Sequence, residues 1–361
     1  MVTSRSGPTC RRLAAVAAAS FLGALCLAAD TVEGDAGRRL DAAVAATAGA
    51  GFRGAVLVAE KGKTLLAKGY GAADGAKSPM TAESLFDVAS VSKQFTAAAV
   101  FKLAEAKKLA LDDSIAKHLP KVPADKKAIT IQHLLNHTAG LPLLIPGLDE
   151  NDSADRDRFV AKVLAAPLAG KPGAAFVYDN HGYSLLAAIV EREGGKPFET
   201  WMRAEVFAPA GMADTGFLGE KQLDGKRLTA RISLVDGKPV PSGDASTFPW
   251  DWSMRGAGGV VSTVRDLERW DRALRDGRVA SKAGQERMFR PALEGFASGW
   301  MVGELDAKGG PAWVFHTGRT LGYQAYVARW LAQDRVIVVL TDEATDPRVL
   351  HGPLVTALAG K

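Results

Sequence analysis

The sequence predicts an α+β fold in which an antiparallel β-sheet is flanked by helices and joined to a mostly helical region. Apolar runs and glycine turns between Phe52 and Asp74 predict a β-hairpin near the start of the chain. Further strand-like segments follow one another between residues 298 and 342, and helix-forming sequence fills most of the interval between the two groups. Because the strands flank the helical block, we expect both groups to share one sheet.

The later strands are separated by short turns, which is typical of an antiparallel meander. A last helix is predicted around Pro347 to Leu358, and the segment before Asp266 opens with a Ser-Thr pair that is typical of a helix cap. The strand segments are SGWMVGEL, AWVFHTG, YQAYVARWL and RVIVVLTD, and the helical ones are KQFTAAAVFKLAEAKKLAL, DRFVAKVLAAPL, GYSLLAAIVEREG and STVRDLERWDRAL. We therefore expect a sheet subdomain of about residues 45–81 and 291–361, and a helical subdomain of about residues 82–290.

The first 29 residues have the layout of a secretory signal peptide. Three arginines precede an uncharged run from Leu13 to Ala29, which is rich in alanine and leucine and ends in small residues. The run has 17 residues, fewer than the ~20 that span a bilayer comfortably, so a retained N-terminal anchor is the weaker alternative. We expect cleavage after Ala28 or Ala29, a secreted or periplasmic mature protein with no membrane attachment, and one functional domain over residues 30–361.

The expected mature chain also excludes several kinds of chemistry. Cys10 and Cys26 both lie in the leader, which excludes disulfides, thiol nucleophiles and cysteine-bound metals. The net charge of +5 falls to +2 without the leader, so the basic balance does not indicate a nucleic-acid partner. His133 and His137 have the spacing of a helical metal pair, but Leu134 stands where such a motif needs glutamate. We therefore expect neither a metal nor an organic cofactor, and the sequence does not predict the oligomeric state.

The segment ASVSKQFTA, residues 89–97, places two serines and a lysine at the start of a predicted apolar helix. Residues three apart lie on one face of a helix, so Ser90 can meet Lys93, whereas Ser92 cannot. The positive end of the helix dipole and its free N–H groups would favour an oxyanion near Ser90. The alternative is that Ser90 only caps the helix and Lys93 is solvated.

Two further triplets support a catalytic role for the motif formed by Ser90 and Lys93. Tyr178-Asp179-Asn180 follows a turn, and His316-Thr317-Gly318 ends a predicted strand. Together with S-x-x-K, and in this order, they resemble the motifs of the serine β-lactamase and DD-peptidase superfamily. The Y-x-N and H-T-G versions are most similar to those of class C β-lactamases and their relatives, among them DD-carboxypeptidases, D-amino-acid peptidases and esterases. Similar connecting segments extend the resemblance from about Phe52 to the C-terminus.

The resemblance implies a role for each matching residue. Ser90 would be the acylated nucleophile, while Lys93 and Tyr178 would transfer the proton. Tyrosine and lysine both lose their proton at about pH 10 in model peptides, so either could be the general base, although a charged Lys93 would favour the ionised phenol. Asn180 would orient the substrate or Lys93. The backbone N–H groups of Ser90 and Arg319 would form the oxyanion hole.

The third motif departs from common family patterns at two positions. His316 stands where most β-lactamases have lysine, which weakens the expectation of efficient antibiotic hydrolysis. Either His316 carries a positive charge that favours carboxylate substrates at low pH, or it stays neutral beside Lys93. Arg319, which follows Thr317 and Gly318, stands where a small residue is common. Its side chain would either crowd the substrate or bind a substrate carboxylate.

The sequence thus predicts an exported serine hydrolase that forms an acyl-enzyme at Ser90. Its partner would be a small molecule or peptide with a reactive carbonyl, and its activity that of a D-Ala-D-Ala-type carboxypeptidase, another peptidase, an esterase or a weak β-lactamase. The alternative is a penicillin-recognising sensor or scaffold that binds or acylates without efficient turnover.

Overall fold

The computed structural model describes residues 1, 30–48, 52–73, 79–146, 148, 155–223, 228–229, 234–235, 238–239, 252–320, 322–342 and 345–360. Apart from Met1, the expected signal peptide lies outside these residues. In the part of the chain that is described, no helix is long and apolar enough to cross a membrane.

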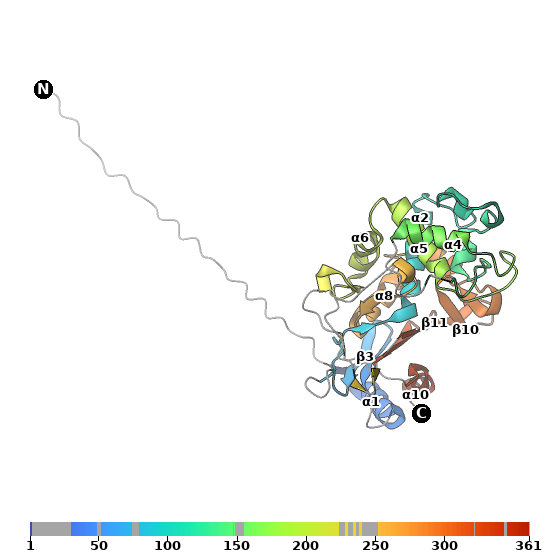
Figure 1. Cartoon of the computed structure of the whole chain (residues 1–361). Coiled ribbons are helices and arrows are strands. Elements are labelled where there is room, and N and C mark those ends of the chain that lie inside the picture. Colours follow the sequence, from blue (N-terminus) through green and yellow to red (C-terminus); the bar gives the residue numbers. More distant parts are fainter. Residues whose placement is uncertain are drawn as a thin grey trace.

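In the middle of the main antiparallel sheet, a strand from the early part of the chain pairs with a strand from its late part (Figure 1). Strand β2 (Gly54–Glu60) pairs along its whole length with β13 (Arg335–Thr341). Both strands are buried on both faces, which explains why their sequences are continuous apolar runs. The prediction that the early and late strands share one sheet is confirmed. The other strands are β1 (Thr31–Val32), β3 (Lys63–Tyr70), β9 (Phe296–Ala297), β10 (Trp300–Leu305), β11 (Pro311–Thr320) and β12 (Tyr323–Trp330), and the spatial order is β1-β3-β2-β13-β12-β11-β10-β9.

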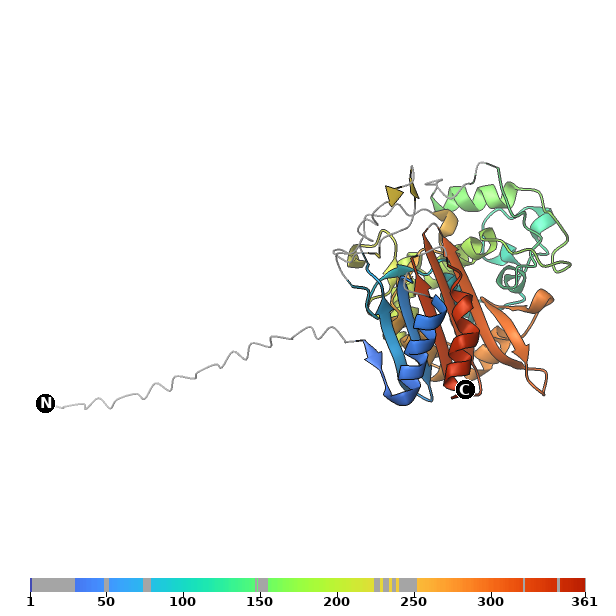
Figure 2. The same cartoon turned by 90° about the horizontal axis from the view of Figure 1, so that it is seen from below.

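One face of this sheet is covered by the first and last helices, α1 (Gly34–Ala48) and α10 (His351–Leu358), which lie side by side (Figure 2). Leu40 and Val44, one helical turn apart on α1, are fully buried in the cluster that also holds Leu354 of α10. Burying each such side chain stabilises the fold by roughly 1.5–3 kcal/mol. The closing helix was predicted, whereas α1 was not, since its alanine- and arginine-rich sequence has few apolar residues to mark a face.

The other face of the sheet packs against α8 (Val264–Arg275) and the helical region (Figure 1). The predicted cap of α8 is confirmed, because the Thr263 hydroxyl accepts a hydrogen bond from the Asp266 N–H at 3.1 Å. Helix α2 ends at Glu105, earlier than expected, and Lys107 just beyond it has a φ of 58°. The remaining helices are α3 (Ile131–Leu135), α4 (Arg156–Ala165), α5 (His181–Gly194), α6 (Phe198–Met202), α7 (Ala208–Ala210) and α9 (Lys282–Met288), and α2 itself spans Ser92–Glu105.

Two small sheets, which the sequence did not predict, complete the structure. Strands β4 (Phe86–Asp87) and β5 (Gly216–Phe217) pair on either side of β8 (Val260–Ser262), and β6 (Leu234–Val235) pairs with β7 (Lys238–Pro239). Strand β4 leads into the turn that carries Ser90, so the first of these sheets fixes where that turn begins.

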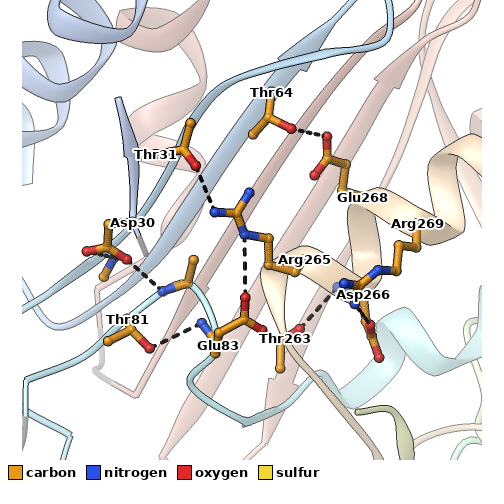
Figure 3. A network of polar contacts seen from close by, with 12 residues as sticks. Asp30, Thr31, Thr64, Thr81, Glu83, Thr263, Arg265, Asp266, Glu268 and Arg269 are labelled. Atoms are coloured by element: carbon orange, nitrogen blue, oxygen red, sulfur yellow. Dashed lines mark hydrogen bonds and ion pairs between the residues drawn. The ribbon is translucent and has the colours of Figure 1, made fainter. Parts of the chain in front are cut away.

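Polar contacts fasten the start of the domain to this region (Figure 3). The Asp30 carboxylate accepts a hydrogen bond from the Ala82 N–H at 3.0 Å. Arg265 of α8 donates to the Thr31 hydroxyl at 2.8 Å and pairs with Glu83 at 3.6 Å. Three segments that are distant in sequence are therefore held together beside the main sheet.

Candidate active site

Ser90 lies in a single 3-10 turn, η1 (Ala89–Val91), that leads directly into α2. Ala89 has a φ of 48°, in the left-handed region that residues with a side chain rarely adopt. Its N–H donates to the Asp87 carboxylate at 2.7 Å, which helps to hold this conformation. The alternative that Ser90 is only the helix cap is wrong, since the N-cap positions of η1 and α2 are Val88 and Val91.

Lys93 is fully buried and is held by three acceptors. Its Nζ donates to Ser90 Oγ at 3.2 Å, to Asn180 Oδ1 at 2.8 Å and to the Ala257 carbonyl at 2.9 Å. Three acceptors match the three N–H bonds of a lysine ammonium group. The expected contact between Ser90 and Lys93 is confirmed, and the alternative of a solvated Lys93 is wrong.

Ser92, the neighbouring serine, is turned into the core. Its Oγ accepts a hydrogen bond from the Val260 N–H of β8 at 3.2 Å, and the residue is 1% exposed. It thereby joins α2 to the small sheet, and its hydroxyl is directed toward β8.

The second motif approaches Lys93 from the start of α5. Asn180 occupies the N-cap position of that helix. The Lys93 Nζ lies 4.9 Å from the centre of the Tyr178 ring and 5.6 Å from that of Tyr183. At these distances the ring faces attract the ammonium charge, so Tyr178 and Asn180 both contribute to binding Lys93.

The third motif lies on β11, which passes close to the Ser90 turn. The pairing of β11 with β10 extends as far as Phe315, opposite Met301, whereas its pairing with β12 continues to Thr320. A Cβ atom placed on Gly318 would lie 2.2 Å from the Val88 carbonyl oxygen. Only glycine therefore lets the strand run this close to the turn that carries the serine.

His316 is buried and neutral. Its Nδ1 lies 2.6 Å from the Thr317 carbonyl, so Nδ1 carries the proton and donates it. Burial, together with the nearby charge of Lys93, lowers the pKa of His316 to about 3. Of the two alternatives for His316, these observations favour the neutral ring, because burial beside a cation disfavours a second charge.

Thr317 and Arg319 alternate along β11 with the buried His316 and Gly318, so their side chains point to the opposite face of the strand. The Arg319 side chain is exposed and lies close enough to Asp346 to help lower the pKa of that carboxyl, mainly set by hydrogen bonds from Arg348. Both side-chain roles expected for Arg319, crowding the substrate or binding its carboxylate, stay predictions.

Sequence reasoning missed two groups of the site, one that contacts Lys93 and one that contacts Tyr178. The Ala257 carbonyl binds Lys93 from a glycine-rich turn, where Gly256 has a φ of 77° and a Cβ atom would lie 2.5 Å from the Tyr183 carbonyl oxygen. His137, for which we expected a structural role and not metal binding, stacks on Tyr178 with ring centres 4.4 Å apart. Among the described residues no group of three or more His, Cys, Asp or Glu could hold a metal ion.

The Beta-lactamase family model matches residues 40–361. The chain belongs to the Beta-lactamase family. It is thereby a serine hydrolase of the type that includes penicillin-binding proteins and β-lactamases, and the resemblance seen in its motifs is confirmed. Penicillin-binding protein 4* of Bacillus subtilis (strain 168) is 30% identical over 316 residues, which are 82% of this chain and 69% of that protein. Protein flp of Staphylococcus aureus (strain COL) is 27% identical over 305 residues, which are 80% of this chain and 59% of flp.

Solved structures share the fold. The D-amino acid amidase from Ochrobactrum anthropi SV3, complexed with L-phenylalanine amide, aligns with a TM-score of 0.74 and 23% identity over 91% of this chain and 99% of that one. The octameric penicillin-binding protein homologue from Pyrococcus abyssi aligns with a TM-score of 0.75 and 24% identity over 91% and 78%. The predicted α+β fold, with its antiparallel sheet and helical region, is confirmed.

Proposed function

We propose that this protein is an exported hydrolase that cleaves amides or esters through an acyl-enzyme at Ser90, without a metal or organic cofactor. The observation that carries the proposal is the fully buried Lys93, whose Nζ contacts Ser90 Oγ at 3.2 Å and Asn180 Oδ1 at 2.8 Å beside the Tyr178 ring. A lysine is rarely buried unless its charge is paired or hydrogen-bonded. Here its nearest polar contacts include a serine hydroxyl.

In the proposed reaction, Ser90 Oγ attacks the carbonyl carbon as its proton passes to Tyr178. Lys93 uses its three N–H bonds on three acceptors, which supports a charged ammonium that stabilises an ionised phenol and leaves the role of base to Tyr178. Collapse of the tetrahedral intermediate breaks the bond to the amine or alcohol, which takes the proton back from Tyr178. Water then attacks the Ser90 ester by the same route and releases the acid.

The developing oxyanion would be bound by the backbone N–H groups of Ser90 and Arg319. The close approach of Gly318 to the Ser90 turn supports this arrangement, since it brings the two segments together. Two backbone donors held in place before the reaction need no rearrangement as charge develops, and each such donor contributes roughly 10²–10³-fold to kcat in related chemistry.

For the substrate, we propose neutral amides and esters ahead of anionic β-lactams. The neutral His316 provides no cation for a substrate carboxylate, and the Arg319 side chain points to the other face of its strand. The D-amino acid amidase, whose fold is similar, is complexed with an amino-acid amide. The lengths of the curated relatives exceed that of this chain, so their substrates are considered only as candidates.

Labelling and turnover together test the proposal. A fluorophosphonate should label the wild type and Ser92→Ala but not Ser90→Ala, whereas labelling that survives in Ser90→Ala would refute the assignment. Turnover is then measured on p-nitrophenyl acetate, D-phenylalanine amide, a D-Ala-D-Ala peptide and a chromogenic cephalosporin. Intact mass over time distinguishes an enzyme, whose adduct appears and clears, from a penicillin-recognising sensor, whose adduct persists. Export is tested by N-terminal sequencing of protein recovered outside the cytoplasm, which should start at residue 29 or 30.

A further inference from the structure

His137 contacts the Tyr178 ring and the backbone on both sides of Tyr178. Its carbonyl accepts a hydrogen bond from the Val177 N–H at 2.9 Å, and its Nδ1 accepts one from the Asp179 N–H at 3.2 Å. Its ring stacks on the Tyr178 ring at 4.4 Å between centres and 27° between planes. The residues before and after Tyr178, and the ring of Tyr178 itself, are therefore all held by one side chain and its own carbonyl.

Burial disfavours a positive charge on the His137 ring, whose Nδ1 lies 3.6 Å from Asp179 Oδ2, so we assign the ring a role in position and not in charge. Burial foremost lowers the pKa of His137, and Lys93 adds to this, while Asp179 opposes it. Because Nδ1 accepts from the Asp179 N–H, the proton of the neutral ring is assigned to Nε2. The ionisable side chains that face it are Lys93 of α2, Asp179 and Tyr178 before α5, Tyr183 of α5 and His316 of β11.

Packing alone does not explain a histidine here. The ring is fully buried, and its Nε2 has no hydrogen-bond partner among the described residues, so a phenylalanine would fill the space without an unpaired N–H. The backbone is also strained, with a φ of 56°. Among the described non-glycine residues with positive φ, only Ala89 and His137 are buried, and they adjoin Ser90 and Tyr178. Strain of this kind concentrates at functional sites.

We propose that His137 is a positioning residue that sets the direction of the Tyr178 phenol toward Ser90 and Lys93. The inference rests on the proposed role of Tyr178 as the base. His137 lies beyond the end of α3, whose last residue is Leu135, so it does not share a helical face with His133.

Two substitutions each remove one of the two contacts that His137 makes around Tyr178, the ring stacking or the hydrogen bond to the Asp179 N–H. His137→Asn keeps an acceptor for the Asp179 N–H, suits positive φ and removes the ring, whereas His137→Phe keeps a ring and removes the acceptor. We expect both to lower kcat, counted per fluorophosphonate-titrated site, by roughly 10- to 100-fold with KM changed by less than about threefold, since they misplace a reacting group without touching bound substrate.

A spectroscopic measurement reports on the environment of the Tyr178 ring and needs no substrate. The chain has five tyrosines, so ¹³C-tyrosine labelling gives few signals, and Tyr178→Phe identifies the one from Tyr178. Both His137 variants should move this signal. The matched control is His133→Asn, because His133 Nδ1 likewise accepts from a backbone N–H, that of Thr130 at 3.2 Å, but is not in contact with Tyr178. It should leave both the signal and kcat unchanged.

The outcomes separate the inference from the proposed function. Wild-type kcat per titrated site in both His137 variants, or an equal loss in His133→Asn, overturns the inference while the proposed function stands. If the wild type turns over no substrate, the proposed function fails, and the Tyr178 signal alone decides whether His137 sets the ring. An unmoved signal in both variants then overturns the inference as well.

Discussion

Replacing Gly318 by alanine should disable the site without unfolding the protein. The Cβ atom of an alanine at position 318 would lie 2.2 Å from the Val88 carbonyl oxygen and 3.2 Å from the Ala89 Cβ. Real Cβ atoms essentially never approach other atoms within 3.0 Å, so β11 and the Ser90 turn must separate by at least 0.8 Å. The φ of Gly318 is not positive, so the contact, and not the backbone conformation, is what alanine changes.

That separation falls between the two N–H groups that would bind the oxyanion. A displacement of about 1 Å costs roughly 100-fold in rate, and loss of one oxyanion donor costs about 10²–10³-fold in kcat. We therefore expect Gly318→Ala to lower kcat/KM on p-nitrophenyl acetate by about 100-fold. Overpacking of this size should lower the free energy of unfolding by about 1–3 kcal/mol, measured by urea denaturation.

Gly352→Ala is the matched control. A Cβ at Gly352 meets nothing within 4 Å, and the residue lies in α10 on the sheet face away from Ser90. Alanine there should leave kcat/KM unchanged and raise the free energy of unfolding by up to about 1 kcal/mol. If Gly318→Ala kept wild-type kcat/KM and stability, the close approach of β11 to the Ser90 turn, and the oxyanion hole inferred from it, would be refuted.

Three further predictions concern stability and cofactors. Ser92→Ala should keep fluorophosphonate labelling but lower the free energy of unfolding by about 1–3 kcal/mol, because it leaves the buried Val260 N–H without its acceptor at 3.2 Å; unchanged urea curves would contradict this. His316 has its pKa lowered to about 3, so between pH 3 and 6.5 the unfolded chain binds a proton that the folded chain does not, and stability should fall as pH falls through that window. His316→Gln should remove up to about 1.4 kcal/mol per pH unit of this slope, and parallel urea-unfolding profiles for wild type and variant between pH 4.5 and 6.5 would count against a neutral His316. EDTA should leave activity unchanged, since no cluster among the described residues could hold a metal ion; activity lost to EDTA and restored by zinc would overturn the expectation.

Local sequence predicted the parts of the fold whose signals are local. The apolar runs of β2 and β13 and the spacing on α2 and α5 are properties of single segments, and the structure has those elements. Helix α1 escaped prediction because only Leu40 and Val44 mark its buried face within a run of small and charged residues. The small sheet around β8 escaped as well, since strands of two or three residues carry almost no periodic signal.

The sequence by itself predicted that Ser90 can meet Lys93, because residues three apart lie on one face of a helical turn, whereas only the structure showed that Lys93 is buried against Ser90 and not solvated. The sequence also determined the family, because the three motifs and their order can be read from the sequence alone. Only the tertiary structure decided the charge state of His316 and the place of His137. The pKa of a side chain depends on its burial and on charges brought to it from elsewhere in the chain, here Lys93. The stacking of His137 on Tyr178 joins residues 41 apart in sequence, a separation at which no local pattern records that two rings will touch.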